Sequence, residues 1–302
     1  MRKKTTPKAW KEKSVLVLQG GGALGSYQAG AYAALHETGY DPQWLAGISI
    51  GSINAAIIAG NPPDLRVEKL RQFWDMVSSN LQFPNLVPGE QGRALYNQLN
   101  AGLVATWGVP GFFRPHNPYV LFNPLAPASL YKTSIYDTSP LKQTLVDLID
   151  FDRLNNGDIR LSMGAVNVKT GNFIYFDSEK IRIRPEHIMA SGALPEGFPP
   201  IEIDGEWYWD GGLVSNTPLQ YVIDEQCDED LCIFQVDLFS AEGRLPEDLF
   251  DVKQRMSDIR YSSRTRLNTS VFRQTQQVRH LIASLLKAHP DQTILKDEEL
   301  KL

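Results

Sequence analysis

A short apolar run that ends abruptly in glycines constrains the fold of this chain more than any other feature. Residues 14–18 (SVLVL) have the pattern of a buried strand, and the QGGG segment at 19–22 follows without a break. A helix is predicted over 26–37, a second buried strand over 44–48 and an apolar helix over 53–59. A helix between two strands is a crossover connection, which makes the strands parallel. The sequence therefore predicts an α/β fold, a three-layer α/β/α sandwich with a mainly parallel central sheet.

Later segments add strands and helices to this plan. A hairpin is predicted over 159–176, and a second hairpin over 201–209 leads directly into Asp210. A continuous apolar run over 231–238 predicts a further strand. At Thr138, Ser139 and Pro140, a hydroxyl cap and a proline at the first helical position predict the start of another helix, which runs through Ile149.

The chain is expected to have a basic N-terminal tail (1–13), one main domain (14–240) and a C-terminal helical extension (241–302). The segment 80–137 is rich in proline, glycine and aromatic residues, and we expect it to form a lid or a pocket, with a packed surface insertion as the alternative. The extension is expected to be structural, with the polar stretch 261–274 as a solvated face. The aromatic and apolar residues expected to shape the pocket are Phe112, Phe113, Tyr119, Leu121 and Phe122.

Composition and charge exclude several classes of protein. Hydrophobic residues make up 42% and charged residues 22% of the 302 residues, which is typical of a globular protein and not of a disordered or fibrous one. The formal net charge of -5 gives no attraction to nucleic acid, so nucleic acid is not expected as a partner. Cys227 and Cys232 are too few for a disulfide framework, and we expect free thiols in the cytoplasm.

The N-terminal residues raise the question of membranes. They are basic, but the apolar run that follows is short and broken by glycines, so we expect a core strand and not an export signal. No stretch approaches the roughly 20 apolar residues that a membrane-spanning helix needs. A peripheral contact of the basic tail with anionic lipid stays open beside the simpler expectation of a solvated tail.

The motif GISIG, residues 47–51, matches the G-x-S-x-G nucleophile elbow. In this turn a strand passes sharply into a helix, and Gly47 and Gly51 leave room for the tight backbone. The predicted strand before the motif and the predicted helix after it provide the context that the elbow requires. Ser49 is therefore a candidate nucleophile, placed where a helix N-terminus favours negative charge.

The loop QGGGALG, residues 19–25, lies between the first strand and the first helix. Consecutive glycines let backbone N–H groups point at a small anion, which for an esterase is the tetrahedral oxyanion. The spacing of these glycines also matches the dinucleotide-binding G-x-G-x-x-G fingerprint. That fingerprint expects an acidic residue at the end of the second strand, whereas Glu37 and Asp41 precede it. The candidate oxyanion-hole residues are Gly20, Gly21, Gly22 and Gly25.

A third motif, WYWDGGLVSNTPL, places Asp210 at the end of an aromatic strand. Gly211 and Gly212 follow and allow close backbone approach, although Asp-Gly-Gly is also a common turn. Asn216, with Pro218 after it, is a candidate helix cap or a group that supports the site.

These segments, in this order, resemble the patatin-like phospholipase family, including bacterial members. The glycine loop corresponds to the family's GGGxxG motif, GISIG to its GxSxG elbow, Asp210 to Gly212 to its DG[GA] motif, and Asn216 with Pro218 to its N-x-P. The resemblance spans about residues 14–240. It implies a Ser49–Asp210 dyad, no metal or other cofactor, and hydrolysis of acyl esters of phospholipids, lysophospholipids or neutral lipids. It also implies that 14–240 is a catalytic domain and that the lid or pocket expected from 80–137 serves the acyl chain. Many family members carry arginine where this chain has Leu24, so the resemblance does not extend to a preference for phospholipid headgroups.

The elbow motif alone would suggest a Ser-His-Asp triad. In an α/β-hydrolase, however, several elements separate the oxyanion loop from the nucleophile, whereas here one helix and one strand are predicted between them. The histidines that follow the serine lie in no glycine-flanked turn, unlike Asp210. They are His116, His187, His280 and His289.

The sequence leaves two further functions open. Acyl transfer to an alcohol or thiol would use the same acyl-serine intermediate. A non-catalytic lipid-binding protein would keep the fold without turnover. Acyl-chain length, headgroup, oligomeric state, membrane recruitment and the completeness of the C-terminus are not determined by the sequence.

Overall fold

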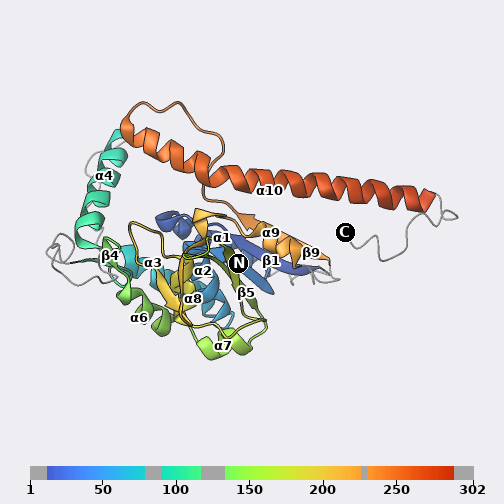
Figure 1. Ribbon diagram of the computed structural model, residues 1–302, viewed down its shortest axis with the longest axis horizontal. Helices are drawn as coiled ribbons and strands as arrows, with labels where there is room; N and C mark the ends of the chain where they lie inside the picture. The colour runs from blue at the N-terminus through green and yellow to red at the C-terminus, as the bar shows by residue number, and fades with distance from the viewer. Residues whose placement is uncertain (1–11, 79–89, 117–132, 226–229, 289–302) are drawn as a thin grey trace, which may run out of the picture.

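A computed structural model of the chain describes residues 12–78, 90–116, 133–225 and 230–288 (Figure 1). The predicted basic tail therefore lies almost wholly outside the described residues, and so does Cys227. Of the predicted insertion 80–137, only a part is described. No helix in the described ranges is both long and apolar enough to cross a membrane.

The described strands form a seven-stranded sheet and a separate two-stranded ribbon. The strands of the large sheet are β1 (Lys13–Leu18), β2 (Trp44–Ile48), β5 (Arg160–Asn167), β6 (Phe173–Asp177), β7 (Ile201–Ile203), β8 (Glu206–Asp210) and β9 (Leu231–Val236). The ribbon consists of β3 (Arg114–Pro115) and β4 (Tyr136–Asp137). In the large sheet β9, β1, β2 and β5 run parallel to one another, while β6 and β8 run antiparallel to β5. The predicted mainly parallel sheet is confirmed.

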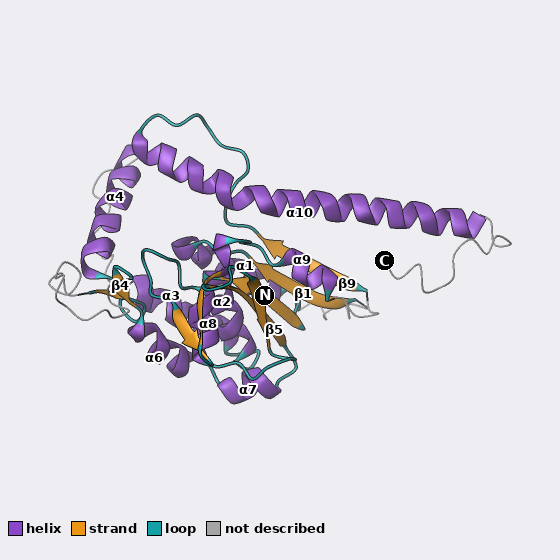
Figure 2. Ribbon diagram, in the orientation of Figure 1, coloured by secondary structure: helices purple, strands orange, loops and turns teal. Residues whose placement is uncertain are grey.

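Helices alternate with the strands in the described ranges (Figure 2). They are η1 (Gly22–Leu24), α1 (Gly25–Glu37), α2 (Ile50–Ala59), α3 (Arg66–Ser78), α4 (Glu90–Trp107), α6 (Ser139–Leu148), α7 (Phe151–Asn156), α8 (Pro185–Ser191), η3 (Gly211–Leu213), α9 (Leu219–Asp224) and α10 (Leu249–Ala288). In the predicted C-terminal helical extension (241–302), the described residues include the long helix α10, whose C-terminal part projects beyond the sheet (Figure 1).

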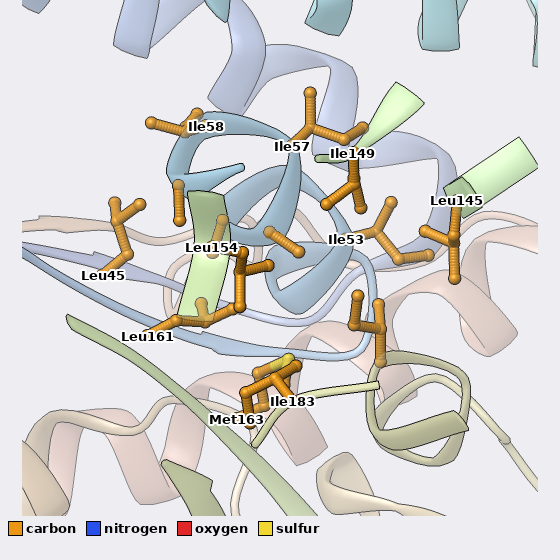
Figure 3. Packing of buried hydrophobic residues seen from close by; sticks show 14 of the residues in the cluster. Leu45, Ile53, Ile57, Ile58, Leu145, Ile149, Leu154, Leu161, Met163 and Ile183 are labelled. Atoms are coloured by element: carbon orange, nitrogen blue, oxygen red, sulfur yellow. The ribbon is translucent and has the colours of Figure 1, made fainter. Parts of the chain in front are cut away.

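Apolar residues on alternate positions of the central strands build a core on each face of the sheet. Leu16, Leu18 and Leu45 belong to the larger core, whereas Val15 and Val17 belong to the smaller one. The larger core contains α2, in which every residue is buried, together with side chains of α6, α7 and α8 (Figure 3). The smaller core includes Val222 of α9. Helices therefore cover both faces, which confirms the predicted three-layer arrangement.

Two local predictions need correction. The helix after the elbow begins at Ile50 and not at Ile53, because Ser49 itself is its N-cap residue. The side chain of Thr138 makes no capping hydrogen bond at the start of α6. Instead, the Asp137 carboxylate accepts a hydrogen bond from the backbone N–H of Ser139 at 2.8 Å, because its side chain reaches the first unpaired donor of the helix.

The larger core leads to a prediction about stability. Leu161 of β5 is 0% exposed, whereas Leu267 of α10 is 61% exposed. Leu161→Ala should lower the free energy of unfolding by about 2–5 kcal/mol, because it leaves a cavity in the core. The same change at Leu267 should alter the free energy of unfolding by less than about 0.5 kcal/mol. Urea unfolding of both variants measures the difference, and equal losses would contradict this description of the core.

Candidate active site

Ser49 lies at the turn between β2 and α2 in a strained backbone conformation. Its φ is 55° and its ψ is −123°, a region that residues other than glycine rarely adopt. A Cβ atom at Gly47 would lie 2.5 Å from the carbonyl carbon of Gly51, and one at Gly51 would collide with the carbonyl oxygen of Leu18. Glycine is therefore required at both positions. The turn presents the Ser49 side chain at the N-terminus of α2.

Asp210 is buried beside Ser49. The side chain accepts a hydrogen bond from the N–H of Gly212 at 2.7 Å, and it lies near enough to the Ser49 side chain for that hydroxyl to lower its pKa. Burial nevertheless raises the pKa of Asp210 to about 6, although Ser49 and Gly212 both favour the ionised form. At neutral pH this carboxyl group is mostly ionised, yet it binds a proton more tightly than an exposed aspartate does. These are the properties of a general base.

The register of β5 explains why two residues so far apart in the sequence meet. Gly164 of β5 pairs with Ile48, the residue before Ser49, and Ala165 pairs with Asp210. The strand β6 occupies one edge of β5 as far as Val166, so β8 must use the edge that β2 uses. Asp210 therefore arrives on β5 directly after the point at which β2 ends.

The glycine loop is held in place by Asn216. The carbonyl oxygen of Asn216 accepts a hydrogen bond from the N–H of Gly20 at 3.1 Å, and its side-chain amide donates to the Gly20 carbonyl at 2.8 Å. Asn216 is 6% exposed and does not cap α9, whose N-cap residue is Pro218. Of the two roles that the sequence left open, the structure gives Asn216 the supporting one.

Not all of the predicted oxyanion donors have a free N–H group. The N–H of Gly20 is bonded to Asn216, and the N–H of Gly25 donates to the carbonyl oxygen of Gly22 at the end of η1. These two residues therefore shape the loop and do not donate to an anion. The N–H groups of Gly21 and Gly22 have no acceptor among the described residues, and Gly22 has a φ of 56°, which glycine adopts without strain.

Ser191, at the end of α8, connects the elbow to β5. Its hydroxyl oxygen accepts a hydrogen bond from the N–H of Ser49 at 3.1 Å, and the same hydroxyl donates a hydrogen bond to the Gly164 carbonyl at 2.7 Å. Because a hydroxyl has only one hydrogen to donate, the Ser52 hydroxyl must be the donor in its 2.7 Å bond with Ser191. Sequence reasoning gave Ser191 no role, although it lies in the ASGALP run before the aspartate hairpin.

Gln19 connects the start of the glycine loop to α10. This side chain is 0% exposed, and its oxygen accepts from the N–H groups of Leu238 and Phe239 at 2.6 and 3.2 Å. Its amide nitrogen donates to the Tyr261 carbonyl and to the Thr265 hydroxyl, both at 3.2 Å. Thr265 is only 7% exposed, so the prediction that 261–274 is a solvated face is wrong at this end of the stretch. The polar residues there pair with buried partners, which residue composition alone does not reveal.

Two cavities meet at Ser49. The first has a volume of about 580 Å³, and the second has a volume of about 410 Å³. The walls of the first are largely apolar and come from α2, α3, α4 and the segment 109–113, with the side chains of Ile50, Ile53, Phe73, Trp74, Val77, Val104, Val109, Phe112, Phe113 and Phe198. The predicted pocket residues Phe112 and Phe113 are among them, whereas Tyr119, Leu121 and Phe122 lie outside the described residues.

The described histidines lie away from both cavities. His116 is hydrogen-bonded to the Ser134 hydroxyl at 3.2 Å, and His187 is 3% exposed with its Nδ1 accepting from the N–H of Arg184. His280 is exposed on α10, and His289 is outside the described part of the chain. In the described ranges, no three His, Cys, Asp or Glu side chains come together as metal ligands.

Comparison with known proteins gives matches over most of the chain. A family model described as patatin-like phospholipase matches residues 16–223, and a second, described as patatin phospholipase, matches residues 259–302. No curated protein matches the chain. A solved structure, VipD from Legionella pneumophila, is similar with 18% sequence identity and a TM-score of 0.44, over 75% of this chain and 50% of that chain. This chain thus spans half the length of VipD in the match.

The raised pKa of Asp210 predicts how stability depends on pH. Because the folded state binds this proton more tightly than the unfolded state, stability should fall as pH rises from about 4 to about 6 and then level off. Asp210→Asn removes the buried charge, so the melting temperature of this variant should exceed that of the wild type at pH 8 and match it near pH 4. Exposed Asp158→Asn is the control. A difference in melting temperature between Asp210→Asn and the wild type that does not vary with pH would contradict the raised pKa of Asp210.

Proposed function

The chain belongs to the patatin-like phospholipase family, and from this premise we propose that it hydrolyses acyl esters of lipids with Ser49 as nucleophile and Asp210 as the only protein base. The family acts on lipid substrates, which supports the general class of reaction. The assignment of roles rests on one observation above all. A serine in a strained elbow lies beside a buried carboxyl group whose pKa is raised to about 6, and both line the same cavity.

The reaction follows from this pair. Ser49 Oγ attacks the ester carbonyl carbon while Asp210 accepts the hydroxyl proton. The N–H groups of Gly21 and Gly22 stabilise the negative charge that develops on the carbonyl oxygen. The bond between that carbon and the alcohol oxygen then breaks, and the alcohol leaves with the proton held by Asp210. The acyl group remains as an ester on Ser49.

Water completes the cycle. It gives a proton to Asp210 as its oxygen attacks the acyl-serine carbonyl, and the fatty acid leaves as Ser49 regains the proton. Acyl transfer would follow the same course with an alcohol or thiol in place of water, so product analysis distinguishes the two reactions. We propose hydrolysis because no feature of the described site favours a second acceptor.

The apolar cavity is the proposed site of the acyl chain. Its volume of about 580 Å³ falls in the range of small-molecule sites, and Phe73 and Trp74 of α3 are part of its lining. Sequence reasoning placed the acyl pocket in the segment 80–137 alone. The side chains from α2 and α3 could not be assigned to it from spacing, because helix faces that line a cavity and helix faces that fill a core are both apolar. Peripheral membrane contact of the basic tail stays a prediction, since residues 1–11 are outside the described part.

The proposed dyad of Ser49 and Asp210 predicts which substitutions lower kcat/KM. Ser49→Ala and Asp210→Asn should each lower kcat/KM for a p-nitrophenyl ester by about a thousandfold or more. His116→Gln, His187→Gln and His280→Gln should keep most of the activity, with folding checked by circular dichroism. The wild-type kcat/KM should rise with pH and level off above about 6, because the ionised form of Asp210 is the base. A folded but inactive histidine variant would restore the triad hypothesis.

The acyl pocket predicts a change in chain-length preference. Val104 of α4 lines the apolar cavity, whereas its neighbour Ala105 is exposed. Val104→Phe should shorten the cavity and disfavour long acyl chains. The ratio of kcat/KM for the dodecanoyl p-nitrophenyl ester to kcat/KM for the butanoyl ester should therefore fall by about tenfold. Ala105→Phe adds the same bulk outside the cavity and should leave this ratio unchanged. If both variants change the ratio equally, α4 does not form the pocket wall.

A further inference from the structure

The two cavities at Ser49 differ in their relation to the base. Both are lined by Ser49, Gly22, Ala23 and Leu194, so the serine lies where they join. Asp210 lines only the cavity of about 410 Å³. The proton that Asp210 takes from Ser49 has to reach the departing alcohol, which must therefore lie on the Asp210 side. This relation makes the smaller cavity the compartment for the alcohol part of the ester.

The first turns of α10 form one wall of this alcohol compartment. Gln254, Ser257 and Tyr261 line it, opposite the glycine loop. The wall is fixed, because the Gln19 amide is hydrogen-bonded to Tyr261 and Thr265, and the hydroxyl of Thr265 is 2.7 Å from that of Thr217. The tilted rings of Phe239 and Tyr261, 4.9 Å apart, add a further contact. A helix expected to be merely structural thus contributes side chains to the site.

The charges around the compartment disfavour an anion. No lysine or arginine is among the described residues that line it. The nearby Arg255 is engaged with the carbonyl oxygens of Ser240 and Ala241, at 3.3 and 2.7 Å. Asp258, which accepts a hydrogen bond from the Gln254 side chain at 2.9 Å, adds a carboxylate next to the lining. The guanidinium of Arg260 lies 5.7 Å from the centroid of the Tyr261 ring, but Arg260 itself is not among the lining residues. A phosphate placed here would therefore meet the carboxylates of Asp210 and Asp258 with no cation in the lining itself.

We propose that the α10 wall makes this enzyme selective for lipid esters whose alcohol is uncharged and carries hydroxyl groups, such as glycerol. The inference rests on the proposed function of Ser49 and Asp210. The Gln254 amide donates to Asp258, which leaves its carbonyl oxygen to accept a hydrogen bond from a hydroxyl of the alcohol. Esters whose alcohol carries a phosphate are excluded by charge and not by size.

The test compares substrates that share one acyl chain. The kcat/KM of the wild type should be at least about tenfold higher for 1-decanoylglycerol than for 1-decanoylglycerol-3-phosphate. Gln254→Lys places a cation in the wall and should reduce this ratio by about tenfold. Gln274→Lys is the matched control, since it makes the same change on an exposed part of α10 roughly 30 Å away and should leave the ratio unchanged.

The outcomes separate this inference from the proposed function. Hydrolysis of p-nitrophenyl decanoate that Ser49→Ala abolishes would support the dyad whichever alcohol is preferred. With that activity present, equal rates on the two glycerol esters would overturn the inference, and so would a ratio that Gln254→Lys leaves unchanged. Absence of p-nitrophenyl decanoate hydrolysis by the wild type would instead overturn the proposed function.

Discussion

The burial of the Asp210 carboxyl group beside Ser49 is the constraint on which the rest of the site depends. A carboxylate held in a buried position is costly, and the Ser49 hydroxyl and the Gly212 N–H offset only part of that cost, which is why the pKa of Asp210 stays raised. The positive φ of Ser49 adds backbone strain of about 1–3 kcal/mol. The packing of the surrounding core offsets both costs, since every residue of α2, the helix that follows Ser49, is buried.

Buried polar side chains hold the elbow, the glycine loop and α10 in place. Ser191 fixes the elbow to β5, Asn216 fixes the glycine loop, and Gln19 fixes the loop to α10. All three are 6% exposed or less, so the hydrogen bonds are made where water cannot replace them. The proposed reacting pair therefore lies within a much larger set of positioning residues. This set also joins α10 to the smaller cavity, and for that reason we propose that a helix distant in sequence from the pair contributes to substrate selection.

The sequence predicted the parts of this arrangement that local chemistry determines. Strand and helix periodicity indicated the sheet and its parallel centre, and the glycines around Ser49 and Asp210 marked turns that no other residue fits. The prediction of donors at Gly20 and Gly25 failed because their N–H groups are bonded to atoms that only the fold brings near. Gln19 and Ser191 had no signal of their own, since a single buried polar residue looks in sequence like any loop or helix end. The role of α10 depends on tertiary contacts, whereas residue composition shows only that part of this helix is polar.

Covalent capture of the acyl group is the most direct test of Ser49 as the nucleophile and Asp210 as its base. Wild-type protein is mixed with excess p-nitrophenyl decanoate, quenched with acid during the first turnover and analysed by intact-protein and peptide mass spectrometry. We expect a mass increase equal to one decanoyl group, located on the peptide that contains Ser49. The same adduct should appear much more slowly in Asp210→Asn. Release of p-nitrophenol without any adduct, or an adduct on a different residue, would contradict it.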